Sequence, residues 1–314
     1  MYNMYLITGG AGFIGSHFVE DILKDDSSAK IVVLDNLSMG RMDNIPNDDR
    51  VEFVKGDVSD LDILNDVFKR YDYDYIIHLA AIASVPDSID DPVRTHIINF
   101  DSTLNIIEHA RKQKNLKRMI FASSAAVYGD NPELPCVETA AVNPITPYGV
   151  DKYASERYVL NASKLFNVPS TAFRFFNVYG PRQNPSSPYS GVISIFADRI
   201  LNGNGKIRIF GDGEQTRDFV FVKDLVSIIR YSMNSPEAVG EVFNIGTGKC
   251  TSLNQLAAVC SKVISKPVSI EYAEPRSGDI RHSVSDISKL RSIGFRAEFT
   301  ELENGLKQLI NSLK

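Results

Sequence analysis

The stretch Tyr5-Leu6-Ile7-Thr8-Gly9-Gly10-Ala11-Gly12-Phe13-Ile14-Gly15 joins a short apolar run to a turn with a glycine at every third position, and Phe18, Val19 and Ile22 then recur at helical spacing. A strand, a glycine turn and a helix in this order form the context of a dinucleotide-binding turn. There the glycines allow a tight turn and close approach of the backbone to a pyrophosphate, which the helix N-terminus binds. Taken alone, the pattern is equally consistent with a purely structural turn.

Asp35 ends the next apolar run, residues 31–34, twenty residues after Gly15. A carboxylate at this place can bind both ribose hydroxyls of an adenosine and repel a 2′-phosphate. The pair of features therefore predicts NAD rather than NADP as the nucleotide. An ordinary turn aspartate is the alternative interpretation.

Strands and helices alternate along the first half of the chain. Further strands are expected at 51–54, 75–81, 118–122 and 171–176, with a helix at 99–112. This alternation predicts an α/β fold of the Rossmann type, a doubly wound parallel sheet with helices on both faces. His78 lies in an apolar run and is expected to be a packed core histidine.

A smaller C-terminal α/β lobe is expected after residue 176. We predict a nucleotide-binding domain over 1–176 and a substrate-binding lobe over 177–314, with part of 219–245 packing back on the first domain. Residues 177–188 are rich in Asn, Pro, Ser and Gly and predict a loop. The other expected elements of this half are helices at 192–201, 223–233, 253–265 and 301–313, and strands at 206–210, 219–222 and 242–245.

Tyr148 and Lys152 stand four residues apart, which places both on one face of a helix. Pro147 suits the first helical position and Thr146 the cap. A phenol is a poor base near neutral pH, but an ammonium group nearby is expected to lower its pKa, so that it can take a proton from a sugar hydroxyl. Such a pair occurs by chance in many chains, so it needs a cofactor site and a hydroxyl partner.

Composition excludes several classes of function. Hydrophobic residues make up 43% and charged residues 23%, and the net charge of −5 gives no reason to expect a nucleic acid or an anionic membrane as partner. The three cysteines match neither a disulfide framework nor a metal site, so we expect no metal and a reduced, cytoplasmic compartment. The N-terminus resembles neither a signal peptide nor a membrane span.

At this point the sequence resembles the extended short-chain dehydrogenase/reductase superfamily, and within it the NAD-dependent nucleotide-sugar epimerases and dehydratases. It looks most like the UDP-glucose and UDP-N-acetylglucosamine 4-epimerases. The matching motifs cover nearly the whole chain in family order: 8–15, 35–38, 56–58, 78–81, 123–129, Tyr148 with Lys152, 174–181, 213–218, and Arg276 with Asp279.

The resemblance implies a role for each matching residue. Tyr148 would be the general base, Lys152 would lower its pKa and hold the nicotinamide ribose, and Ser124 would bond to the reacting sugar hydroxyl. The implied NAD-binding residues are Gly9, Gly12, Phe13, Ile14, Gly15, Asp35, Asn36, Ser38, Gly40, Asp57, Val58, Leu79, Ala80, Ala81, Asn99, Tyr148, Lys152 and Phe176. The implied residues for binding a UDP-sugar are Ser84, Ser124, Asn177, Val192, Arg208, Phe210, Arg217, Arg276, Asp279 and Ser283.

The residues after Ser124 distinguish reaction types within the resemblance. Sugar 4,6-dehydratases of this fold carry an acid and a base there, whereas this chain has Ala125 and Ala126, which cannot move a proton. Cys136 does not stand where ketosugar 3,5-epimerases carry a catalytic cysteine. The expectation is therefore NAD-dependent 4-epimerisation of a UDP-hexose through a transient 4-keto sugar.

The sugar is predicted from one position after the Arg276 loop. In the family, a tyrosine there accompanies restriction to glucose and galactose, and Ser283 at this position leaves room for an acetamido group. We expect UDP-GlcNAc and UDP-GalNAc as substrates, together with UDP-Glc and UDP-Gal. The alternatives are an epimerase of a UDP-uronic acid, a net oxidoreductase of a nucleotide sugar, and a non-catalytic NAD-binding scaffold, which an intact Ser124, Tyr148 and Lys152 set disfavours.

Family members often dimerise through two helices that form a four-helix contact. The resemblance therefore implies a homodimer through the helix around residues 99–112 and the Tyr148 helix. Ile106, Tyr153 and Leu160 are apolar positions that could serve this surface or face the sheet instead.

Overall fold

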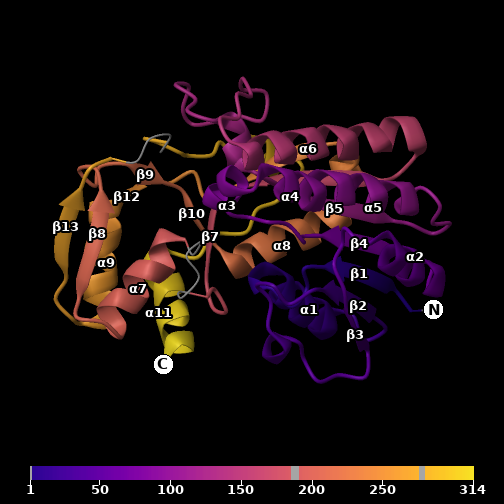
Figure 1. Cartoon of the computed structure of the whole chain (residues 1–314), viewed down its shortest axis with the longest axis horizontal. Helices are drawn as coiled ribbons and strands as arrows, with labels where there is room; N and C mark the ends of the chain where they lie inside the picture. Colours follow the sequence, from indigo (N-terminus) through magenta and orange to yellow (C-terminus); the bar gives the residue numbers. More distant parts are fainter. Residues whose placement is uncertain (1, 185–190, 276–279) are drawn as a thin grey trace. The chain divides into compact units, whose positions relative to one another are not determined.

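The computed structural model describes residues 2–184, 191–275 and 280–314. The chain divides into two compact units, and Figure 1 labels their helices and strands. The first comprises Met1–Val127, Thr146–Arg174 and Val226–Phe243, and the second comprises Tyr128–Ile145, Phe175–Leu225 and Asn244–Lys314. Residues 128–145 are thus grouped with the later part of the chain. The expected division into domains at residues 176 and 177 stays a prediction.

A seven-stranded sheet is the centre of the first unit, in the order β11-β6-β5-β4-β1-β2-β3. β1 pairs in parallel with β2 and β4, and β2–β3 and β4–β5 are parallel as well. The sheet thus grows outward from β1 in both directions, which confirms the predicted doubly wound α/β fold. Its strands are β1 (Met4–Thr8), β2 (Lys30–Asp35), β3 (Val51–Lys55), β4 (Tyr75–His78), β5 (Arg118–Ser124), β6 (Ser170–Phe175) and β11 (Val242–Ile245).

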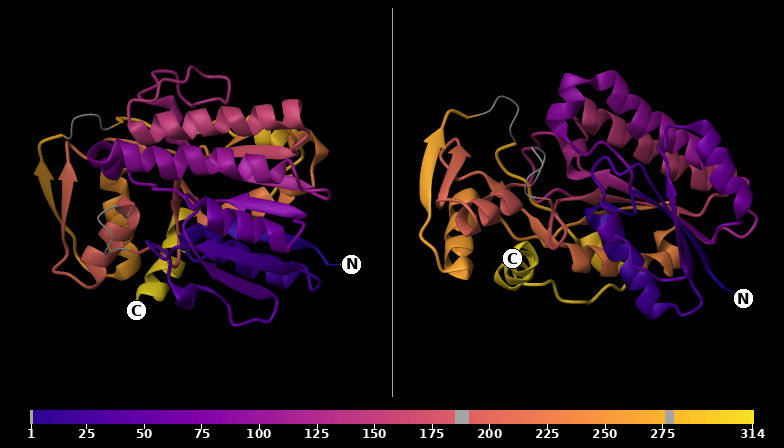
Figure 2. Two further views of the ribbon diagram at one scale, coloured as in Figure 1. Left: turned by 45° about the vertical axis from the view of Figure 1, so that its right-hand side comes forward. Right: turned by 60° about the horizontal axis from the view of Figure 1, so that its bottom comes forward.

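Helices cover both faces of this sheet. They are α1 (Phe13–Asp25), α2 (Leu61–Arg70), α3 (Val85–Asp90), α4 (Pro92–His96), α5 (Ser102–Ala110), α6 (Pro147–Phe166) and α8 (Val222–Met233), with short turns η1 (Met42–Asn44), η2 (Ile97–Asp101), η3 (Ala125–Tyr128) and η4 (Pro236–Ala238). Figure 2 shows α5 and α6 side by side along the sheet. Alternate residues of a strand face opposite sides, so each strand contributes to two cores.

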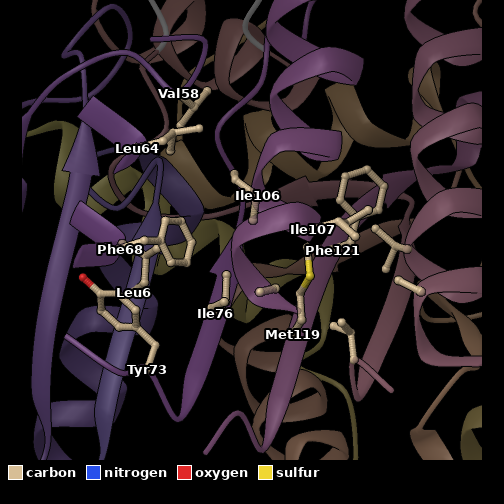
Figure 3. Packing of buried hydrophobic residues seen from close by; sticks show 14 of the residues in the cluster. Leu6, Val58, Leu64, Phe68, Tyr73, Ile76, Ile106, Ile107, Met119 and Phe121 are labelled. Carbon is tan, nitrogen blue, oxygen red and sulfur yellow. The ribbon is translucent and has the colours of Figure 1, made fainter. Parts of the chain in front are cut away.

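The core beneath α2, α5 and α6 is built from one side of the strands. Leu6, Ile76 and Met119 pack there against Phe68 of α2 and Ile106 of α5, as Figure 3 shows. Fully burying an aliphatic side chain of this size contributes roughly 1.5–3 kcal/mol. Ile106 and Leu160 therefore face the core rather than the surface, which settles for these two residues the question that the sequence left open.

The opposite side of the sheet meets α1, whose Phe18 and Ile22 are fully buried. Ile7 and Val33 are also fully buried and alternate with the residues of the first core. Arg230 Nε of α8 lies 3.2 Å from Asp21 Oδ2 of α1, so residues 226–233 of α8 run beside α1. These contacts fix the helix that follows the glycine turn.

Two expectations for the first unit were wrong in detail. β4 ends at His78 instead of residue 81, because the chain then turns to bond Thr8: the Ala80 amide donates to Thr8 Oγ1 at 3.3 Å. The helix expected at 99–112 begins as the π-helical turn η2 and continues as α5 to Ala110. Helices α2, α3 and α4 were not predicted, although Asp60, Ser84 and Asp91 cap them.

The second unit contains three small pairs of strands and four helices among the residues described here: β7 (Asn177–Tyr179), α7 (Val192–Leu201), β8 (Lys206–Phe210), β9 (Thr216–Arg217), β10 (Phe219–Phe221), β12 (Thr251–Ser252), α9 (Leu253–Ile264), β13 (Ser269–Ala273), α10 (Ser288–Ser292) and α11 (Leu302–Leu313). Asn177–Tyr179 was expected to be a loop, but it forms β7 because β10 pairs with it in parallel. Among the residues with assigned positions, no helix has the length and apolar character that crossing a membrane requires.

Candidate active site

The glycine turn follows β1 directly and is sterically closed to side chains. Gly9 has a φ of +71°, and a Cβ on it would lie 2.8 Å from the Ala80 nitrogen. A Cβ on Gly15 would lie 2.3 Å from the Gly9 oxygen. α1 begins at Phe13, with Gly12 as its N-cap residue, so the amides of its first turn lie at the positive end of the helix dipole. The turn is thus a cradle of backbone that fits a dinucleotide pyrophosphate.

Asp35 holds its carboxylate beside this turn. Oδ2 accepts a hydrogen bond from the Ala11 amide at 3.0 Å, and Oδ1 accepts one from the Leu37 amide at 2.8 Å. Burial raises the pKa of Asp35, whereas hydrogen bonds from the Leu37, Ala11 and Gly12 amides oppose that rise. Gly40 packs against the same group, since a Cβ there would lie 3.0 Å from Asp35 Oδ1. Two backbone amides therefore hold the carboxylate beside the glycine turn, and its contact with a ribose diol stays a prediction.

Asp57 follows the end of β3 and forms a hydrogen bond with Asn36, which follows the end of β2. Asn36 Nδ2 donates to Asp57 Oδ2 at 2.7 Å, and the Ser38 amide donates to Asn36 Oδ1 at 2.8 Å. Burial alone would raise the pKa of Asp57, but hydrogen bonds from Ser59 and Asn36 bring it below its ordinary value. Val58 is buried in the core. The structure thus brings these four predicted residues together, while their contact with an adenine stays a prediction.

Residues that follow β4 form a second wall near the turn. The Ala80 backbone adjoins Gly9, and Leu79 and Ala81 flank it with partly buried side chains. Asn99 is buried in η2, where its Oδ1 accepts from the Ile82 amide at 2.8 Å and its Nδ2 donates to the Ile82 oxygen at 3.0 Å. Asn99 therefore fixes the loop after β4, and its assignment to the nicotinamide stays a prediction.

Ser84 has a structural task in this loop. Its Oγ accepts from the Asp87 amide at 3.1 Å and so caps α3. Its predicted contact with a sugar stays a prediction.

Ser124, Tyr148 and Lys152 meet at the end of β5 and the start of α6. Thr146 caps α6 as expected, with its side chain accepting from the Gly149 amide at 3.1 Å. The Ser124 hydroxyl lies close enough to the Tyr148 phenol to lower its pKa. Lys152 Nζ donates to the Ala122 oxygen at 2.8 Å and lies 5.9 Å from the centroid of the Tyr148 ring. The hydroxyl partner that the Tyr–Lys pair required is therefore present.

The expected fall in the Tyr148 pKa is wrong in its net direction. Burial raises the pKa of Tyr148, and the hydrogen bond with Ser124 only partly opposes this. The physical reason is that a phenolate loses its hydration in a buried place. Burial also lowers the pKa of Lys152 to about 8, against the raising effect of the Asp151 carboxylate. Lys152 is thus mostly charged at neutral pH and loses its charge just above it.

His78 is a packed core residue, as expected. Its Nδ1 bonds to Thr8 Oγ1 at 2.7 Å and its Nε2 to Thr103 Oγ1 at 3.1 Å, and burial lowers its pKa to about 3. It is therefore neutral at physiological pH. Thr8 was missed by the sequence reasoning, although its hydroxyl supports the loop through the Ala80 amide.

Several predicted substrate residues gather within the second unit. Asn177 opens β7, and its amide donates to the Asp218 oxygen at 3.0 Å. The Ser283 amide and Arg217 Nη1 both donate to the Thr216 oxygen, at 3.2 and 2.9 Å. Ser283 and Arg217 are thus neighbours.

Other predicted residues of this unit lie on different elements. Phe176 stacks at a tilt on Tyr128, with ring centroids 6.3 Å apart. Arg208 is exposed and forms an ion pair with Glu271 at 2.7 Å. Phe210 ends β8 beside Ala273 of β13, and Val192 begins α7. Arg276 and Asp279 lie outside the described residues. The cofactor contact of Phe176 and the substrate contacts of the other residues stay predictions.

No group of three or more histidine, cysteine or acidic side chains that could hold a metal ion occurs in 2–184, 191–275 and 280–314. All three cysteines, Cys136, Cys250 and Cys260, are free. The side chains at the end of β5 and the start of α6 that could take part in chemistry are a serine, a tyrosine and a lysine.

Comparison with known proteins gives the chain its relatives. A UDP-N-acetylglucosamine 4-epimerase from Methanobrevibacter ruminantium M1, solved with UDP-N-acetylmuramic acid, superposes with a TM-score of 0.92 at 38% identity, over 100% of this chain and 99% of that one. A UDP-glucose 4-epimerase from Thermotoga maritima, solved with UDP-glucose, superposes with a TM-score of 0.92 at 36% identity, over 99% and 98%. A UDP-glucose 4-epimerase from Mycolicibacterium smegmatis is 38% identical over 92% of this chain and 91% of its own length.

The matching family model spans residues 5–246, which include the glycine turn, Ser124, Tyr148 and Lys152. The agreement of that model with relatives aligned over almost the whole length of both chains shows that this chain belongs to the NAD dependent epimerase/dehydratase family.

Proposed function

We propose that this NAD-dependent enzyme interconverts the C4 epimers of a UDP-hexose and retains its NAD throughout. The proposal depends on one observation: Ser124, Tyr148 and Lys152 lie close together at the end of β5 and the start of α6. Ser124 is followed in the chain by Ala125 and Ala126, where a dehydratase would need an acid and a base. The names of the relatives support a UDP-sugar as substrate. NAD, when bound, would accept a hydride from C4 and return it to the opposite face of the resulting 4-keto sugar.

The residues of the chain would move the proton in this reaction. Ser124 would orient the 4-hydroxyl, and Tyr148 would take its proton and later return it. Because Lys152 is charged below pH about 8 and lies over the Tyr148 ring, its charge would stabilise the phenolate as it forms. The cradle of Gly9, Gly15 and Asp35 would keep the dinucleotide bound between turnovers.

Replacement of the phenol tests this assignment. Tyr148→Phe should abolish turnover and leave NAD bound, because only the hydroxyl is removed. Tyr153→Phe removes a phenol from the same helix and should leave the rate unchanged. The two rates and the NAD content of the purified variants are the measurements. A Tyr148→Phe enzyme with appreciable activity would refute the role of Tyr148.

We infer that the enzyme tolerates an N-acetyl group at C2 of the sugar, with UDP-GlcNAc and UDP-GalNAc as substrates alongside UDP-Glc and UDP-Gal. The support is the small side chain of Ser283 next to Arg217, which is proposed to bind the diphosphate. Ser283→Tyr should suppress epimerisation of UDP-GlcNAc before that of UDP-Glc, whereas Ser283→Ala should keep both. If Ser283→Tyr lost epimerisation of both UDP-sugars equally, that would count against the proposal that Ser283 decides whether an N-acetyl group is accepted.

A uronic acid substrate would need a cation for its carboxylate. Arg94 is exposed and its charge acts on Asp57, while Thr95 donates to the Asp91 oxygen at 2.9 Å. Neither observation favours this alternative, so the 4-epimerase of a neutral hexose remains the proposal.

We propose that the enzyme is a homodimer through the helix around residues 99–112, which comprises η2 and α5, and through α6. Exposed apolar side chains occur on α6 at Val150, Tyr158 and Leu165, on η2 at Ile97, and on the preceding α4 at Val93. A stable contact between two copies would bury such a surface. Light scattering after size exclusion should give twice the mass of the chain, and Val150→Glu should halve it. A monomeric wild type would refute the proposal.

A further inference from the structure

A buried network of three polar residues lies behind the candidate catalytic residues. Arg174 Nε donates to Glu156 Oε2 at 2.9 Å, and Arg174 Nη2 donates to Glu156 Oε1 at 2.7 Å. Ser123 Oγ also donates to Glu156 Oε2, at 2.6 Å. Glu156 is fully buried, and the Ser123 and Arg174 residues are 2% and 3% exposed. The Glu156 carboxylate is therefore held from two sides.

Each member of the network belongs to a different element of the first unit. Ser123 precedes Ser124 in β5 and shares the side of that strand with Phe121, which faces the core beneath α6. Glu156 lies one helical turn beyond Lys152, on the buried face of α6. Arg174 comes from β6. The network thus connects β5, α6 and β6 at one point, within a turn of the candidate catalytic residues.

Stability alone is a weak reason for such an arrangement. Replacing a buried ion pair by apolar residues of similar volume is often neutral or stabilising, because two charges must be removed from water. A hydrogen-bonded buried pair instead specifies one geometry, since any displacement leaves a buried charge without its partner. A shift of about 1 Å in a reacting group can reduce a rate by a factor on the order of a hundred.

We propose that the Ser123–Glu156–Arg174 network is a positioning device that sets the register of α6 against the end of β5, so that the Ser124 hydroxyl meets the Tyr148 phenol. Lys152 Nζ makes a second tie between the same two elements, through the Ala122 oxygen. The network is buried, and in this proposal it acts through Ser124 and Tyr148. This inference rests on the catalytic roles proposed above for those two residues.

Ser123→Ala is the sharpest test, because it removes the tie to β5 and leaves the ion pair intact. The expected result is a fall in kcat on the order of tenfold with little change in KM. Weakening of the Ser124 hydrogen bond should also move the Tyr148 titration to higher pH, measured by ultraviolet difference spectroscopy of tyrosinate, with Tyr148→Phe identifying the signal. Ser123→Thr keeps the hydroxyl and should restore both values.

The matched control is Ser170→Ala. Ser170 is also fully buried, and its hydroxyl donates to the oxygen of Val159, which lies three residues beyond Glu156 on α6 and so farther from Tyr148. Its loss should lower thermal stability without moving kcat or the tyrosinate titration. A second variant, Arg174→Lys, keeps the charge and loses the two-point contact, and it should move the titration in the same direction as Ser123→Ala.

Two outcomes would overturn the inference. One is a Ser123→Ala enzyme that loses stability as Ser170→Ala does, with kcat and the Tyr148 titration unchanged. The other is a Ser123→Thr enzyme that fails to restore them. If the wild type epimerised no UDP-sugar, the proposed function would fail, while the tyrosinate titration would still decide whether the network positions Tyr148.

Discussion

Asp35→Asn should weaken NAD binding and relax the discrimination against NADP. The two carboxylate oxygens of Asp35 accept the Ala11 and Leu37 amides, and the side chain has an exposed fraction of only 8%. Asparagine offers one acceptor oxygen, so one buried amide would lose its partner, at a stability cost of about 1–3 kcal/mol. Loss of a charged hydrogen bond to the ribose would cost about 1.5–3 kcal/mol of binding, or roughly 10- to 150-fold in the NAD Kd.

The assay is calorimetric titration of NAD and NADP into nucleotide-free protein, together with thermal unfolding. Asp26→Asn is the matched control, because Asp26 also accepts a backbone amide, that of Ser28 at 2.9 Å, and lies at the far end of α1. It should lose stability and keep its NAD affinity. An Asp35→Asn protein that binds NAD like the wild type, or an Asp26→Asn protein that loses as much affinity, would refute the reasoning.

Three further predictions follow from single contacts. Because Lys152 must be charged and its pKa is about 8, kcat should fall as the pH rises through 8. Asp151→Asn removes the charge that raises the Lys152 pKa, so in this variant the fall in kcat should begin at lower pH. An unchanged pH profile of kcat in Asp151→Asn would contradict this prediction. Gly15→Ala should abolish NAD retention, since the new Cβ would lie 2.3 Å from the Gly9 oxygen. Gly191→Ala should retain NAD, because its new Cβ meets only the end of the Gln183 side chain, at 3.0 Å. Arg118→Lys should lower the free energy of unfolding in urea by about 1–3 kcal/mol and leave kcat unchanged. The reason is that a lysine cannot reach the Thr171 hydroxyl and the backbone oxygens of Ser232 and Ser235 together. A variant as stable as the wild type would refute this prediction.

Local chemistry explains why much of the fold could be predicted. The glycine turn, its strand and α1 follow from residues 5–22, and the Thr146 cap of α6 follows from residues 146–152. α7 begins and ends where the apolar period predicted, at Val192 and Leu201. In each case the signal lies within one or two helical turns of the residues that it places.

The errors arose where a distant segment decides the structure. β7 is a three-residue strand paired with β10, so Val178 and Tyr179, although favourable in strands, form too short a run to predict one. Ile106 has a position on α5 that suits either a surface or a core, and packing on the sheet decides between them. The net pKa of Tyr148 likewise depends on the segments that bury it, which a spacing of four residues does not reveal.

The sequence predicted which residues belong to the candidate site, but it did not predict the contacts that hold them in place. The sequence predicted that Ser124, Tyr148 and Lys152 act together. In the structure they lie at the end of β5 and the start of α6, and their catalytic roles stay a proposal. The sequence did not reveal that Glu156 completes a buried network behind them. The signal was present in the helical spacing from Lys152 to Glu156, but its partner Arg174 lies 18 residues farther along the chain, in β6.

The most direct test of the central claim is incubation of the purified protein with UDP-GlcNAc, UDP-Glc and UDP-GlcA in separate reactions without added NAD, followed by chromatographic separation of the C4 isomers. The account predicts interconversion of UDP-GlcNAc with UDP-GalNAc, with slower or equal interconversion of UDP-Glc and none of UDP-GlcA. Absence of any C4 isomer, or turnover only when NADH is supplied, would contradict it.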